Sequence, residues 1–115
     1  MPPKFMFTKE QLIEASLNII RRGGPQSLTA RSLAGELGCS VKPIFGLFKN
    51  MEEVRLETIK AADRIYRGYI GAASHAEEKP YKAMGMAYIR FATEEKELFK
   101  LPVSYTHLRA HETSA

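Results

Sequence analysis

Signals that start and stop helices are spaced so closely in residues 1–50 that only short helices fit between them. Thr8 followed by Gln11 matches a capping box, and a helical pattern of apolar residues follows it. Two glycines before Pro25 end that pattern, which predicts a helix over 9–22. Runs that alternate apolar and polar residues, as strands do, are few, so the fold is predicted to be all-α.

Two shorter helices are expected next, joined by a tight turn. Thr29 is the predicted N-cap of one helix, which ends near Leu37, and Ser40 is the predicted N-cap of the next, over 41–48. Two short helices joined by a glycine-containing turn are the sequence form of a helix-turn-helix. Residues 1–50 are therefore predicted to be a three-helix head that contains this motif.

Longer helices are expected beyond the head. Asn50, with an acid three residues later, predicts the start of a helix over 51–74. A polar connector separates this helix from a fifth one over about 80–93, and a short sixth segment begins near Glu94.

The two halves differ in how many apolar side chains they hold. The head is predicted to close a small core from Leu12, Leu17, Ile20, Leu33, Leu37, Ile44 and Phe48. Residues 55–101 hold more large apolar groups than a short, open bundle can bury. We therefore expect a compact head and a more loosely held second half that binds dyes.

Composition excludes several classes of protein. One cysteine rules out an internal disulfide framework, and the histidines are too scattered for a zinc cluster. There is no nucleophile–base pair and no glycine-rich phosphate loop, so neither an enzyme nor a cofactor is predicted. No apolar run approaches the roughly 18 residues of a membrane span, and no signal peptide is recognisable, so a cytoplasmic protein is expected.

The net charge is +4, and the excess lies mostly in the head. Residues 1–55 hold eight Lys and Arg against five Asp and Glu, whereas residues 56–101 hold eight against seven. A basic head is what contact with nucleic acid requires, although a mild excess does not prove it.

The end of the chain has a different character. Residues 103–113, Val-Ser-Tyr-Thr-His-Leu-Arg-Ala-His-Glu-Thr, resemble the translation, in one frame, of a transposase adapter used to prepare sequencing libraries. We expect 102–115 to be a non-native tail and the native frame to be truncated near Leu101. His107, Arg109 and His111 are therefore excluded from functional reasoning.

Residues 28–54 concentrate a set of features that occur together in one family. The features are Thr29, Leu33-Ala34, Gly38, Ser40, Ile44-Phe45, Phe48-Lys49-Asn50, Glu52-Glu53 and Val54. With this set, the chain resembles the DNA-binding module of the TetR/AcrR family of transcriptional regulators over about 8–60. Residues 61–101 are similar, more loosely, to the start of that family's ligand-binding domain.

This resemblance implies a three-helix head, a connecting fourth helix, and a partial ligand-binding and dimerisation domain over 51–101. It also implies a ligand-responsive repressor that binds a palindromic double-stranded DNA operator as a homodimer. A small-molecule effector in the full-length protein would shift the fourth helix and change the spacing of the two recognition helices. The family's dimers form through C-terminal helices that this chain lacks.

Candidate base-reading residues lie on the third helix, because the second helix of a helix-turn-helix enters the major groove. Lys42 can donate to guanine or to a phosphate, and Val41 offers an apolar contact to a thymine methyl group. Phe45, and Gly46 beside it, lie on the same outer face.

Candidate phosphate contacts surround that helix. Thr29 and Ser40 can present hydroxyls and helix N-terminal amides, and Lys49 follows the recognition helix. Arg31 occupies a position that in the family reaches a base or a phosphate.

The chain departs from the family pattern at several of these positions. Phe45 replaces the usual tyrosine, so the hydroxyl contact to a phosphate is lost. Gly46 and Leu47 stand where aromatic residues or histidine are frequent, and Met51 stands where a phosphate-binding lysine is common. The operator is therefore expected to be read in a different way.

Alternative interpretations remain for each feature. Arg31 and Lys42 could be solvated surface cations, and Phe45 could belong to the core. The aromatic residues Tyr66, Tyr69, Tyr88 and Phe91 fit helix packing better than a ligand pocket. The whole chain could also be a helical protein–protein interaction module without DNA binding, which salt-dependent retention on DNA would distinguish.

Overall fold

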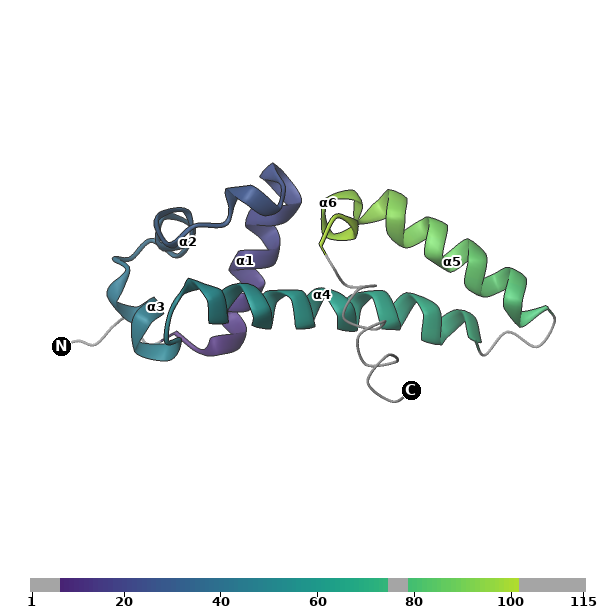
Figure 1. Ribbon diagram of the computed structural model, residues 1–115, viewed down its shortest axis with the longest axis horizontal. Helices are drawn as coiled ribbons and strands as arrows, with labels where there is room; N and C mark the ends of the chain where they lie inside the picture. The colour runs from purple at the N-terminus through teal and green to yellow at the C-terminus, as the bar shows by residue number, and fades with distance from the viewer. Residues whose placement is uncertain (1–6, 75–78, 102–115) are drawn as a thin grey trace. The chain divides into compact units, whose positions relative to one another are not determined.

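The computed structural model describes residues 7–74 and 79–101, and all regular structure in these ranges is helical (Figure 1). The elements are α1 (Lys9–Gly23), the 3-10 turn η1 (Pro25–Ser27), α2 (Ala30–Leu37), α3 (Lys42–Leu47), α4 (Met51–Ser74), α5 (Pro80–Glu94) and α6 (Lys96–Phe99). The predicted all-α fold is confirmed. The predicted tail over 102–115, with its two histidines and arginine, lies outside the described residues.

The chain divides into two compact units, with the boundary between Thr58 and Ile59 inside α4. The sequence-based division follows the start of the fourth helix at residue 51, whereas packing assigns the first two turns of that helix to the first unit. The reason is visible in the burial of Val54 and Thr58, which are 0% and 1% exposed.

The first helix begins and ends where the capping signals predict. The Gln11 backbone N–H donates to Thr8 Oγ1 at 3.0 Å, and the Thr8 N–H donates to Gln11 Oε1 at 2.9 Å. Gly24 ends the helix at φ +91°, a backbone conformation that residues with a side chain rarely adopt. The predicted range of 9–22 is therefore accurate to one residue.

The second helix has a capping box of its own. The Ser32 N–H donates to Thr29 Oγ1 at 3.0 Å, and the Thr29 N–H donates to Ser32 Oγ at 2.9 Å. Gly38 ends the helix in the left-handed region at φ 71° and ψ 36°. This glycine turns the chain into the third helix, as predicted for a helix-turn-helix.

The third helix is shorter than the predicted 41–48, and its N-cap is Val41 rather than Ser40. Val41 already has helical dihedrals, so its carbonyl accepts the first bonds of the helix, from Ile44 and Phe45. Ser40 contributes differently, because its Oγ accepts the Lys42 N–H at 3.3 Å. The helix ends before Phe48, whose backbone is extended.

The start of α4 is anchored to the rest of the first unit. Asn50 Oδ1 accepts the Glu53 N–H at 2.9 Å, and the Glu53 carboxylate accepts the Lys49 N–H at 2.6 Å. Further along, Arg55 Nη2 donates to the Leu28 carbonyl at 3.1 Å. Two local bonds and one long-range bond thus hold the segment that follows α3.

All residues of the predicted head core except Leu37 are buried. Leu37 is only half-buried, so its place in the predicted core is wrong. Leu28, between η1 and α2, and Val54, on α4, complete the core instead. Leu28 lies outside any long periodic run, and a pattern search on helices therefore misses it.

The second unit consists of the remainder of α4 with α5 and α6. Phe91 and Leu98 are fully buried there, and Phe91 stacks edge-on with Tyr66 at 5.2 Å and with Phe99 at 6.2 Å between ring centroids. The fifth helix continues one residue beyond its predicted end, and α6 starts at Lys96 because Glu95 has non-helical dihedrals.

Large apolar side chains of α5 remain exposed, as the apolar count of the sequence predicts. They are Tyr81, Met86, Tyr88 and Ile89. No helix in the described ranges is long and apolar enough to cross a membrane.

Candidate nucleic-acid interface and ligand groove

All seven predicted DNA-binding residues are exposed in the first unit. They are Thr29, Arg31, Ser40, Val41, Lys42, Phe45 and Lys49. They come from the start of α2, from the turn before α3, and from α3 and the residues that follow it, which are consecutive parts of the chain in Figure 1. The structure thus leaves every one of these side chains accessible to a partner.

The third helix has one buried face and one exposed face. Ile44 and Phe48, four residues apart, are 0% and 2% exposed. Val41 and Phe45, also four residues apart, are 40% and 44% exposed. Val41 is the N-cap and Phe48 the C-cap of α3, so these pairs extend one residue beyond the helix at each end, and the segment packs on one side and presents the other to solvent. The interpretation of Phe45 as a core residue is therefore wrong.

The cations of this surface are not neutralised by neighbouring acids. Within residues 7–74 and 79–101, no ion pair joins Arg31, Lys42 or Lys49 to a carboxylate. Arg22, in contrast, pairs with Glu36 across α1 and α2. Unpaired cations on an exposed surface are available to bind phosphate.

The two predicted hydroxyl contacts differ in what they can donate. The Thr29 hydroxyl donates to Ser32 Oγ at 3.2 Å and accepts the Ser32 N–H. The Ser40 hydroxyl accepts the Lys42 N–H and has no acceptor for its own proton in the described part of the chain. A phosphate oxygen can only accept, so Ser40 suits it and Thr29 serves mainly as a cap.

The backbone that follows α3 is also hydrogen-bonded within the chain. The Lys49 N–H donates to the Glu53 carboxylate, which leaves the ammonium group of Lys49 as the group available to a phosphate.

Sequence reasoning missed Ser32, the central residue of the α2 cap, whose Oγ donates to the Ser27 carbonyl at 2.8 Å. The Thr-x-x-Ser spacing is the signal that could have identified it.

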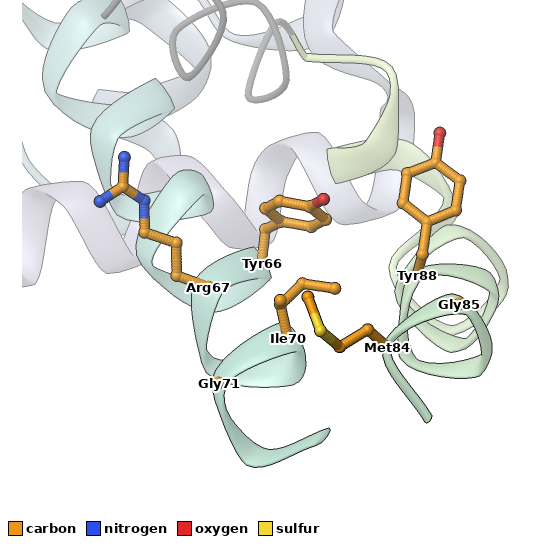
Figure 2. A pocket seen from close by; sticks show the side chains of 7 residues that line it. All are labelled: Tyr66, Arg67, Ile70, Gly71, Met84, Gly85 and Tyr88. Carbon is orange, nitrogen blue, oxygen red and sulfur yellow. The ribbon is translucent and has the colours of Figure 1, made fainter. Parts of the chain in front are cut away.

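A second candidate site is an open groove in the second unit, of about 470 Å³, between α4 and α5. Figure 2 shows the side chains that form its walls. We call it the α4–α5 groove; it is lined by Tyr66, Arg67, Ile70, Gly71, Met84, Gly85 and Tyr88.

The lining of the α4–α5 groove presents no free charge. Arg67 Nε lies 2.7 Å from Asp63 Oδ2, and Figure 2 shows its guanidinium extending away from Met84 and Tyr88. The Tyr66 hydroxyl is neutral at neutral pH, as in any tyrosine, and burial raises its pKa further. A thioether, two phenol rings and an aliphatic side chain suit an uncharged aromatic molecule.

The four aromatic residues that the sequence analysis assigned to packing have divided roles. Tyr69 stacks edge-on with Phe91 at 5.5 Å and donates its hydroxyl to Glu94 at 2.7 Å. Tyr66 and Tyr88 also meet edge-on, at 6.3 Å, but both line the groove. Packing is therefore the correct interpretation for two of the four and incomplete for the others.

The residues of the two sites include no metal centre. Within the described ranges, no group of three or more His, Cys, Asp and Glu side chains could hold a metal ion. No family model, curated protein or solved structure matches the chain.

Proposed function

We propose that the chain is the DNA-binding part of a transcriptional regulator of the TetR/AcrR type, which reads an operator with α3 in the major groove. One observation supports this most directly. The exposed face of α3 presents apolar and cationic side chains together, and within the described residues Arg31, Lys42 and Lys49 are not paired with an acid. Duplex DNA is a polyanion whose base edges lie in a groove wide enough for a helix.

The alternative, a protein–protein interaction module, explains this surface less well. A protein partner would have to supply carboxylates for Arg31, Lys42 and Lys49 around a small apolar centre. Interfaces between proteins are depleted of lysine, whereas interfaces with DNA are enriched in positive charge.

Ligand response is the second part of the proposal. The α4–α5 groove offers space for a small effector, and two of its walls, Tyr66 and Ile70, belong to α4. The same continuous helix begins after a three-residue link from α3, and its Arg55 side chain donates to the Leu28 carbonyl. An effector that moves α4 therefore has a physical route to the head. We also propose that the full-length protein acts in the cytoplasm as a homodimeric repressor.

Selection from a randomised duplex library, at low salt and with the chain as it exists, tests the proposal. We expect an enriched motif whose affinity falls linearly with the logarithm of salt concentration. Lys42→Ala and Arg31→Ala should each weaken binding by about 1–3 kcal/mol and relax selection at one position if they contact bases. If these residues contact phosphates instead, the same substitutions should weaken binding to all sequences equally.

Two exposed cations of the second unit provide the matched control. Arg64→Ala and Lys82→Ala change the net charge by the same amount and should leave the motif and the affinity nearly unchanged. Retention without an enriched motif, or equal losses in both pairs of variants, would contradict sequence-specific reading by α3.

A further inference from the structure

We propose that Val41 and Phe45 together read the 5-methyl groups of two thymines, which makes them specificity-determining residues. This inference rests on the proposed DNA-binding function and extends it to what the operator contains. Its starting observation is the exposure of large apolar side chains in the first unit. Three large apolar side chains are exposed in its described part, Val41, Phe45 and Leu56, and two of them, the N-cap Val41 and Phe45 one turn later, lie on the outer side of α3.

The chemistry of the side chains restricts what they can recognise. Valine and phenylalanine have no hydrogen-bond donor or acceptor, so neither can read the polar edge of a base. The major groove presents one methyl group, on C5 of thymine, among otherwise polar base edges. An apolar residue directed into that groove therefore favours thymine and leaves the other bases unsatisfied.

The spacing of the two side chains sets the spacing of the two thymines. Residues four apart on a helix have Cβ atoms about 5–6 Å apart. Successive base pairs are about 3.4 Å apart along the duplex axis. The two methyl groups are therefore expected one or two base-pair steps apart, on either strand.

The surroundings favour a close approach by a polyanion. Lys42 follows Val41 directly and is unpaired in the described structure, so a phosphate or guanine contact lies beside the apolar one. Gly46 follows Phe45, and a Cβ added there would meet nothing within 4 Å. The fold thus does not need this glycine, whereas a duplex lying against α3 gains from the absence of a side chain.

The test uses the duplex obtained by selection, with each thymine replaced in turn by deoxyuridine, which removes only the methyl group. We expect two thymines, one or two steps apart, whose replacement weakens binding about fourfold each, the value of one buried methyl group. Val41→Ala should abolish the effect at one thymine, and Phe45→Ala should abolish it at the other. Both side chains are exposed, so these variants should fold, as circular dichroism would verify.

Leu56→Ala is the matched control, because Leu56 is an equally exposed apolar residue of the same unit, 51% accessible. The deoxyuridine effects should be unchanged in this variant. Specific binding that is indifferent to every deoxyuridine would overturn the inference and leave the proposed function intact. Failure to select any motif would overturn both.

Discussion

The outer face of α3 and the α4–α5 groove both present apolar groups to solvent, but they differ in the charges around them. On α3, Lys42 has no ion-pair partner in the described chain, whereas in the groove Arg67 is bound by Asp63 at 2.7 Å. An apolar surface next to unpaired cations suits a polyanion, and one next to a neutralised cation suits an uncharged molecule. Hydrophobic exposure alone would not have distinguished the two sites.

The largest expected effect concerns whether the two regions belong to separately stable units. Phe48→Ala in the first unit and Phe91→Ala in the second each remove a buried ring and should cost about 3–5 kcal/mol of local stability. Hydrogen exchange should show lost protection mainly in the unit that contains the substitution. Equal loss over both units, from either variant, would show that the chain unfolds as one cooperative body.

A smaller effect should separate the groove from ordinary apolar surface. Gly85→Leu places a side chain in the α4–α5 groove, where a Cβ meets nothing within 4 Å, so the helix should tolerate it. Binding of the neutral dye N-phenyl-1-naphthylamine, followed by fluorescence, should weaken about tenfold, or about 1.4 kcal/mol.

Gly68→Leu is the control for this experiment, since Gly68 is equally open but does not line the groove. It should leave dye binding unchanged. The comparison between the two sites would fail if both glycine variants bound the dye equally, because the dye would then report general apolar exposure.

The smallest effect is electrostatic. The Tyr69 hydroxyl, and secondarily Arg90, lowers the pKa of Glu94, and the same bond raises the pKa of Tyr69. The stabilisation from Glu94 is present above the ordinary glutamate pKa and is lost as the pH falls through its lowered pKa. Tyr69→Phe should move the pKa of Glu94 upward, towards the ordinary value, in a carboxyl NMR titration. An unchanged titration would mean that the bond does not persist in solution.

Local signals predicted the helices well because each is determined by residues close in sequence. Thr8 and Gln11 bond each other across one turn, and Asn50 caps α4 in the same way. The predicted cap of α3 failed because Ser40 and Val41 compete for one position, and the outcome depends on how the buried Ile44 and Phe48 seat the helix.

The two sites were unequally predictable for the same reason. The seven candidate residues of the interface lie in one stretch of the chain, from Thr29 to Lys49, so they could be chosen from periodicity and a family resemblance. The groove requires α4 and α5 to pack with Tyr66 towards Tyr88, a pairing between residues 22 positions apart that no local pattern specifies. Leu28 entered the core unpredicted because it lies between η1 and α2, outside any periodic run.

The bond from Arg55 to the Leu28 carbonyl has a consequence for the order of folding. It joins residues 27 positions apart, and the loop that it closes contains the whole of α2 and α3. A six-residue helix such as α3 is far below the length of about 12–15 residues at which isolated helices become even marginally stable. We therefore expect α3 to form late, after the first turns of α4 have docked, and Arg55→Ala to slow refolding more than it accelerates unfolding. During synthesis, the exposed face of α3 would then form only after residues beyond Arg55 have left the ribosome.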